Sequence, residues 1–177
     1  LEKISNSFDS DLEIMIRFTP GIECHTHEYI RTGSFDSKFG FGIEYLNTLF
    51  SRIRDTKHLK LKGIHAHIGS QIFELDPHKD LGEIMVNVIA EAKKFGHFIE
   101  ELNVGGGLGI KYTENDDPPS IDEWVKTIST SVVKACNRHK LDLPTLMCEP
   151  GRSIVSTAGI TIYKIGAFKE IPGIRTY

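Results

Sequence analysis

The sequence has few cysteines, no excess of positive charge and no long apolar run. Its three cysteines, Cys24, Cys136 and Cys148, are scattered and form no C-x-x-C pair, which argues against a disulfide framework and a zinc site. The formal net charge is −3, so no nucleic-acid partner is expected. No apolar stretch approaches the length of a membrane span, and the first residues resemble neither a signal nor a transit peptide. We therefore expect a soluble, cytoplasmic protein without a metal site or membrane contact.

A glycine triplet, Gly105 to Gly107, ends the apolar part of the run LNVGGGLGI. Residues without a Cβ let the backbone approach a ligand and point its N–H groups at an anion, so phosphate is one interpretation. A tight turn between a strand and a helix is the other. The dinucleotide pattern G-x-G-x-x-G is absent, because Ile110 stands at its third glycine, and no G-K-[ST] follows. A phosphate bound here would belong to another kind of ligand.

Apolar residues recur at three- and four-residue spacing in three segments, which predicts helices over residues 43–53, 77–95 and 121–138. Asp76 is expected to cap the second helix, with Pro77 in its first turn and Gly96 at its end. Ser120 and Glu123 form an S-x-x-E capping box before the third helix. These end signals make the helix boundaries well defined.

Four short apolar runs alternate with the predicted helices, at residues 12–18, 61–68, 99–104 and 145–149. This alternation predicts an α/β protein with a parallel sheet and right-handed crossovers. A full (β/α)₈ barrel takes about 250 residues, so the chain is expected to form part of a TIM-type barrel. After Gly151 the sequence becomes rich in β-branched residues. We therefore expect a partial barrel over residues 1–155 and the start of a C-terminal β domain over 156–177.

Three of the four predicted strands end in polar motifs, which are HAHIGSQ, NVGGGLG and CEPGRS. Because the carboxyl ends of parallel strands meet at one edge, these motifs should converge there. His65 and His67 alternate along one strand, so they could form a metal pair or simply pack in the sheet. No third ligand with metal-site spacing supports the metal.

A carboxylate and a guanidinium stand at the end of the last predicted strand, at Glu149 and Arg152. A buried carboxylate needs a cationic partner, and an arginine beside a glycine suits a phosphate or a substrate carboxylate. A local ion pair between the two residues is the simpler interpretation. Taken together, however, the three motifs offer an acceptor for a protonated ring nitrogen, a flat group that stacks on a ring, and phosphate donors. This set matches pyridoxal phosphate.

The same motifs resemble the diaminopimelate decarboxylase family, a fold-type III group of pyridoxal-phosphate enzymes related to ornithine decarboxylase and alanine racemase. The resemblance rests on HAHIGSQI, NVGGGLGI and EPGRSIV, and on HEYIRTGSFDSKFGF at residues 27–41. It covers essentially the whole chain, with the motifs in order. It implies an alanine racemase-like barrel and decarboxylation of meso-2,6-diaminopimelate to L-lysine.

The resemblance also implies a role for each motif residue. His67 would stack on the cofactor ring, and Glu149 would accept a hydrogen bond from the pyridine nitrogen and keep it protonated, so that the ring accepts electrons. Arg152 would lie near the phosphate and the distal carboxylate of the amino-acid substrate. The remaining cofactor-binding residues would be Ser70, Gly105, Gly106, Gly107, Pro150 and Gly151.

Two family residues have no counterpart in this sequence. No lysine here stands in the context of the lysine that carries the cofactor, and Lys38 belongs to a different motif. None of the three cysteines matches the family's acid/base cysteine. We therefore expect these 177 residues alone to be inactive, and the resemblance implies a homodimer for the whole enzyme.

Two alternatives remain open. Ornithine, arginine or carboxynorspermidine decarboxylases share the fold, although Gln71 and Ser153 favour diaminopimelate by resemblance. A non-catalytic relative that only binds a partner protein is the other alternative. The intact glycine triplet, Glu149 and Arg152 argue against it, because a binding protein does not need a partner for the ring nitrogen.

Overall fold

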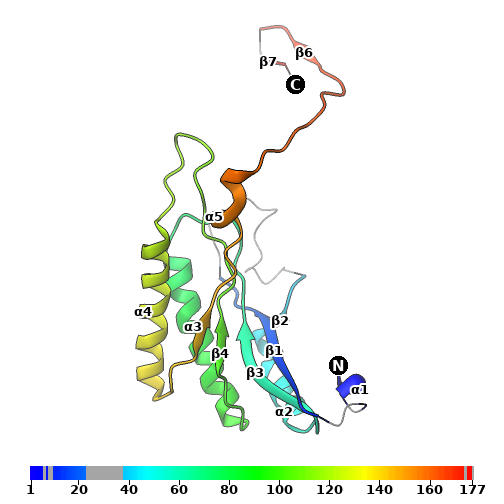
Figure 1. Ribbon diagram of the computed structural model, residues 1–177, viewed down its shortest axis with the longest axis vertical. Helices are drawn as coiled ribbons and strands as arrows, with labels where there is room; N and C mark the ends of the chain where they lie inside the picture. The colour runs from blue at the N-terminus through cyan, green and yellow to red at the C-terminus, as the bar shows by residue number, and fades with distance from the viewer. Residues whose placement is uncertain (6, 8–9, 23–37, 174, 177) are drawn as a thin grey trace.

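The computed structural model describes residues 1–5, 7, 10–22, 38–173 and 175–176. Cys24 and most of the motif at residues 27–41 lie outside the described residues. Figure 1 shows a parallel sheet at the centre of the molecule. The α/β prediction is therefore confirmed.

Five parallel strands form this sheet in the order β2-β1-β3-β4-β5. Their bounds are β1 (Leu12–Thr19), β2 (Phe41–Gly42), β3 (Leu59–His65), β4 (Glu101–Asn103) and β5 (Thr145–Met147). The register places Leu102 of β4 opposite Ile64 of β3 and Leu146 of β5. All four predicted strands exist. The last two are shorter than predicted, because β4 ends at Asn103, the first residue of its polar motif, and β5 ends at Met147, just before its motif.

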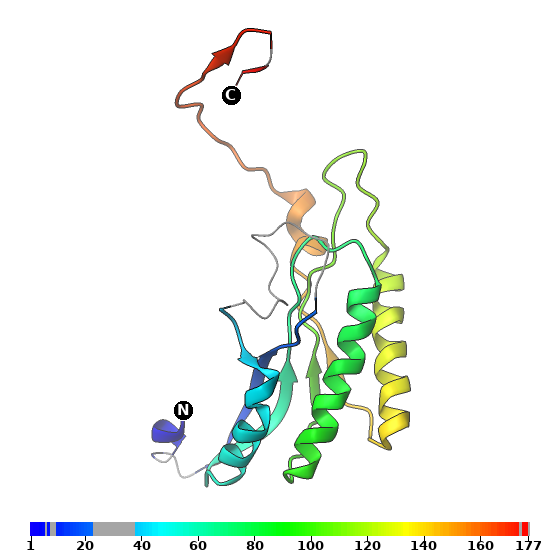
Figure 2. The same ribbon diagram turned by 180° about the vertical axis from the view of Figure 1, so that it is seen from behind.

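Three helices connect the strands and lie on one face of the sheet (Figure 2). They are α2 (Leu46–Arg54), which follows the 3₁₀ turn η2 (Ile43–Tyr45), α3 (Asp76–Lys94) and α4 (Ile121–His139). Fully buried side chains of the sheet, such as Phe18, Ile64 and Leu102, form a core with Phe50 of α2 and Met85 of α3. One face of the sheet is thus covered by the helices that the apolar periodicity predicts.

Two of the predicted helix ends are confirmed and one is wrong. Ser120 accepts a hydrogen bond from the Glu123 N–H at 3.2 Å, and the Glu123 carboxylate accepts one from the Ser120 N–H at 2.9 Å, which is a complete capping box. Gly96 ends α3 in a left-handed conformation, with φ +89°. Asp76 does not cap α3, because the helix begins one residue earlier than expected, after Leu75. The Asp76 carboxylate still lies at the positive end of the helix dipole.

The chain forms short elements after β5. The short helix α5 (Arg152–Val155) and the 3₁₀ turn η3 (Ser156–Ala158) lie beyond the carboxyl ends of the strands (Figure 1). An extended segment then leads away from the sheet to β6 (Glu170–Ile171), which pairs antiparallel with β7 (Arg175–Thr176). Apolar side chains of this segment, such as Ile160 and Tyr163, are exposed. A separate C-terminal domain from residue 156 stays a prediction.

A buried histidine packs between α3 and α4 at the ends nearest the carboxyl edge of the sheet. The ring of His78 is 1% exposed and meets Trp124 edge to face, with 5.6 Å between ring centroids. Neither ring nitrogen of His78 has a hydrogen-bond partner among the described residues. Burial, together with the nearby His67, lowers the pKa of His78 to about 4. His78 is therefore neutral in the folded protein at pH 7.

Acid should destabilise the protein through His78. The pKa of His78 is lowered from 6.5 to about 4 by folding. Between these two pH values the unfolded chain binds a proton at His78 and the folded chain does not. The stability contributed by neutral His78 is therefore fully present above pH 6.5 and is lost as the pH falls towards 4. At pH 4.5 the loss from this residue is about 2–3 kcal/mol. His78→Phe keeps a ring against Trp124 and should remove this part of the loss, as measured by urea unfolding at pH 7 and pH 4.5. An equal pH dependence in both proteins would contradict the prediction.

Candidate functional site

The three polar motifs meet at the carboxyl edge of the sheet, as predicted. They occupy the loops that follow β3, β4 and β5, and the loop after β4, residues 105–110, is called here the glycine loop. A Cβ built on Gly105 would lie 2.7 Å from His67 Nδ1, and one on Gly107 would lie 2.5 Å from the Gly69 carbonyl oxygen. A Cβ on Gly106 would overlap the backbone carbonyl of Glu149. The glycine loop therefore touches the loops on both sides.

Two of the three glycine N–H groups donate hydrogen bonds within the protein. Gly105 donates to the Asn103 side-chain oxygen at 2.9 Å, and Gly106 donates to His67 Nδ1 at 3.2 Å. Gly105 and Gly107 have left-handed backbones, with φ of +67° and +106°. A tight turn is therefore one reason for the triplet. Phosphate binding by the triplet stays a prediction, and it would depend mainly on Gly107 and on the first N–H groups of α5, which have no partner within that helix.

Glu149 follows β5 and reaches back across the end of β4. Its Oε1 accepts a hydrogen bond from Asn103 Nδ2 at 2.9 Å and lies 3.6 Å from His65 Nε2. The Glu149 side chain is 54% exposed, so it does not carry the cost of a buried carboxylate without a cationic partner. Asn103 holds the carboxylate through one oxygen, so a ligand can still reach the group from the open side.

The two histidines of the first motif differ in position. His65 is the last residue of β3, whereas His67 lies in the following loop, so the expectation of a shared strand is wrong. Burial is the main cause that lowers the pKa of both imidazoles below the usual value, and the nearby Arg17 adds to it, while Glu149 opposes it. His67 Nδ1 accepts the Gly106 N–H. Both rings are therefore neutral at pH 7.

Arg152 bridges all three loops. Its Nε donates to the Ser70 hydroxyl at 2.7 Å, and its Nη1 donates to the Tyr112 hydroxyl at 2.7 Å. The simpler interpretation from the sequence, a local ion pair with Glu149, is wrong: no ion pair joins the two residues in the part of the chain that the structure describes. The guanidinium instead holds a hydroxyl from each neighbouring loop. A dense set of donors results at this end of the site.

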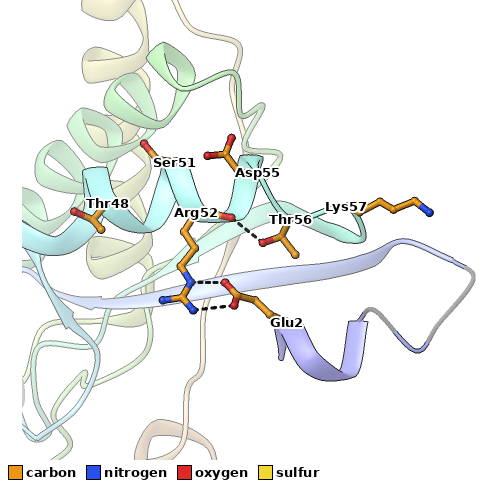
Figure 3. Close-up of a pocket in the computed structure, with 7 residues that line it drawn as sticks. All are labelled: Glu2, Thr48, Ser51, Arg52, Asp55, Thr56 and Lys57. Carbon is orange, nitrogen blue, oxygen red and sulfur yellow. Dashed lines mark hydrogen bonds and ion pairs between the residues drawn. The ribbon is translucent and has the colours of Figure 1, made fainter.

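Among the hollows on the described residues, one borders the site and another lies near Glu2 and α2. A cavity of about 130 Å³ borders the site, and its lining includes Gly107, Trp124 and Ser153. A larger hollow of about 610 Å³ lies beside the segment that precedes β3 (Figure 3). There Glu2 pairs with Arg52, and Thr56 donates to the Arg52 carbonyl oxygen at 2.8 Å. The second hollow contains none of the predicted site residues.

The described residues offer neither a metal cluster nor a membrane-spanning helix. No group of three or more histidine, cysteine or acidic side chains among them could hold a metal ion. No described helix combines the length and apolar character needed to cross a membrane. Cys136 is buried, which raises the pKa of its thiol, and Cys148 is exposed.

Sequence reasoning missed three residues that shape the site. Arg17 of β1 pairs in register with His65, Asn103 orients Glu149, and Tyr112 binds Arg152. Gln71, which the sequence offered only as a mark of resemblance, bonds to the glycine loop. Arg17 and Asn103 are polar residues near the carboxyl ends of apolar strands, which is a usable signal. No pattern distinguishes Tyr112, which lies in an irregular loop.

Comparison with known proteins gives a consistent result. Residues 1–156 match the family model of the pyridoxal-binding domain of pyridoxal-dependent decarboxylases. The chain is 52% identical over 177 residues to diaminopimelate decarboxylase of Synechocystis sp. and 39% identical over 180 residues to that of Bacillus subtilis. Each alignment covers 100% of this chain but only 38% and 41% of the relative. The chain thus spans well under half the length of the curated relatives it matches.

Solved structures show the same similarity. Diaminopimelate decarboxylase of Helicobacter pylori, complexed with L-lysine, matches with a TM-score of 0.77 and 30% identity over 87% of this chain and 37% of that one. The enzyme from M. jannaschii matches with a TM-score of 0.78 and 29% identity over 97% and 39%. The prediction that the chain forms part of a TIM-type barrel is confirmed.

The close approach at Gly106 leads to a prediction about stability. Gly106→Ala places a Cβ against the backbone carbonyl of Glu149, and backbone cannot move aside as a flexible side chain would. We expect a loss of about 1–3 kcal/mol in the free energy of unfolding of the whole protein. Gly151→Ala is the matched control, since a Cβ there meets nothing within 4 Å, and it should leave stability nearly unchanged. Equal stability of the two variants in urea would show that the loops are not in contact.

Proposed function

Because the chain belongs to the pyridoxal-dependent decarboxylases, through the pyridoxal-binding domain of that family, we propose that the whole protein decarboxylates meso-2,6-diaminopimelate. The products would be L-lysine and carbon dioxide, and the cofactor would be pyridoxal 5′-phosphate. The observation that carries this proposal is the convergence of the loops after β3, β4 and β5 on one set of contacts. The substrate rests on the relatives, which are named diaminopimelate decarboxylases at 52% and 39% identity.

The site has the features that pyridoxal phosphate requires. Gly105, Gly106 and Gly107 have no room for a Cβ, so the glycine loop packs directly against the loops on both sides and brings their polar groups to one surface. His65 Nε2 is buried without a hydrogen bond from the described residues. Such a group is costly in a closed core, but it is common beside a ligand site. A half-exposed carboxylate at one end and a guanidinium at the other correspond to the two charged ends of the cofactor, its ring nitrogen and its phosphate.

Glu149 would act at the nitrogen end of the site. When bound, the cofactor supplies a conjugated ring that accepts the electron pair left by departing carbon dioxide. Glu149 favours that chemistry because a carboxylate next to the ring nitrogen raises the pKa of the nitrogen and keeps it protonated. Asn103 fixes one carboxylate oxygen at 2.9 Å, so the group is oriented before any ligand arrives.

The other motif residues would bind and orient. His67 offers a neutral ring whose plane is fixed by the hydrogen bond from Gly106, and a neutral ring can lie against the cofactor without repelling its charged nitrogen. Ser70, Gly107 and Arg152 would hold the phosphate. Pro150 and Gly151 keep the turn between Glu149 and Arg152 short, so that both charged groups serve the same site. Arg152 would also lie near the distal carboxylate of the substrate.

Three further features of the whole protein stay proposals. We expect a homodimer, a cytoplasmic location, and a C-terminal β domain that begins near residue 156. The first rests on the family resemblance alone. The change from helix to an extended segment with exposed apolar residues after η3 supports the third.

Replacement of Glu149 should separate catalysis from binding. Glu149→Gln in the whole protein keeps the shape and the contact with Asn103 but removes the charge, so the ring nitrogen loses its proton. We expect kcat for release of carbon dioxide from meso-2,6-diaminopimelate to fall by about 10²-fold or more. Binding of pyridoxal phosphate, followed by absorbance, should weaken far less.

Glu114→Gln, in an exposed part of the loop before α4, is the matched control and should retain full activity. Ornithine and arginine serve as competing substrates. Turnover of either in preference to diaminopimelate would overturn the proposed substrate, and near-normal turnover by Glu149→Gln would remove Glu149 from the mechanism.

A further inference from the structure

Gln71 has an unusual backbone conformation in the loop after β3. Its φ is +58°, and among the described residues the only other non-glycine with a positive φ is Lys140, at the end of α4. The left-handed region is unfavourable for a residue with a Cβ, and Gln lacks the short polar side chain that helps Asn and Asp there. Strain of this kind persists only where surrounding contacts hold it.

The side chain of Gln71 supplies those contacts. Its Nε2 donates to the Ile110 carbonyl oxygen at 2.7 Å, and its Oε1 accepts from the Ile110 N–H at 3.2 Å. The amide thus pairs with both backbone groups of one residue, as a neighbouring strand would. The left-handed turn directs the side chain towards the glycine loop while the backbone continues to Ile72.

Ile72 extends the same pairing by its backbone. Its N–H donates to the Gly107 carbonyl oxygen at 2.9 Å, and its carbonyl oxygen accepts from the Gly109 N–H at 2.9 Å. Ile72 and Leu108 form a parallel bridge, and both side chains are buried. Four hydrogen bonds from two consecutive residues therefore join the loop after β3 to the glycine loop.

The residue before Gln71 is Ser70, whose hydroxyl accepts the Arg152 Nε–H at 2.7 Å. On the other side of the contact, Gly107 packs so closely that a Cβ would lie 2.5 Å from the Gly69 carbonyl oxygen. A slip between the two loops would separate Ser70 and Arg152 from Gly107. The Gln71 amide opposes such a slip, because both of its hydrogen bonds end on a single residue of the glycine loop.

We propose that Gln71 is a positioning residue that locks the loop after β3 to the glycine loop and so assembles Ser70, Gly107 and Arg152 into one phosphate-binding surface. The proposal rests on the proposed function, since it assigns the phosphate end of that cofactor site. Gln71 itself does not touch the cofactor. Its replacement should therefore affect ligands with a phosphate more than ligands without one.

The test compares binding of pyridoxal 5′-phosphate and of pyridoxal to the whole protein. Gln71→Gly removes the side chain and accepts the left-handed backbone, whereas Gln71→Glu keeps the length but loses the donor to the Ile110 carbonyl. We expect both to weaken pyridoxal phosphate about tenfold, equivalent to the loss of one or two hydrogen bonds. Pyridoxal should change less than twofold. Glu114→Gln should change neither dissociation constant.

A second measurement reports directly on the contact between Gln71 and the glycine loop. Hydrogen exchange by mass spectrometry should show faster exchange over residues 105–110 in both Gln71 variants, with the helices unchanged. An equal loss of affinity for both ligands, or unchanged affinity for both, would overturn the proposal. This holds even if hydrogen exchange over residues 105–110 becomes faster. Failure of the unaltered protein to bind pyridoxal phosphate would instead overturn the proposed function, so the two failures are distinguishable.

Discussion

The backbone of the glycine loop approaches the loops on both sides more closely than any side chain would allow, and the site depends on this contact. All strands of the sheet run parallel, so the loops after β3, β4 and β5 leave from the same edge. Parallel strands alone would still leave side chains between the loops. Glycine at positions 105 to 107 removes them, so that the carbonyl groups of Gly69 and Glu149 lie against the glycine loop.

The polar groups of the site are then satisfied across the loops instead of within them. Asn103 at the end of β4 holds Glu149 from β5, Arg152 from α5 holds Ser70 after β3, and Gln71 holds Ile110. Each of these hydrogen bonds joins segments at or beyond the carboxyl ends of two different strands. The arrangement places an oriented carboxylate and a guanidinium on one surface with neutral imidazoles between the loops, which supports the proposed ligand with a cationic ring nitrogen and an anionic tail.

Sequence reasoning reached the fold and the meeting of the three motifs because both depend on local signals. Apolar periodicity located α2, α3 and α4, the Ser120 capping box fixed the start of α4, and the three motifs followed strands whose direction was known. The contacts between loops could not be predicted from the sequence. The pairing of Arg152 with Ser70 instead of Glu149, the strained backbone of Gln71 and the packing of His78 on Trp124 depend on distances between distant segments.

The most direct measurement is a crystal structure of the whole protein with pyridoxal 5′-phosphate. The account predicts one bound molecule at the carboxyl edge of the sheet, with its ring nitrogen within hydrogen-bond distance of the Glu149 carboxylate. Its phosphate should lie against Ser70, Gly107 and the start of α5. A cofactor bound elsewhere, or one whose phosphate lies at Glu149 and whose ring nitrogen lies at Arg152, would contradict the account.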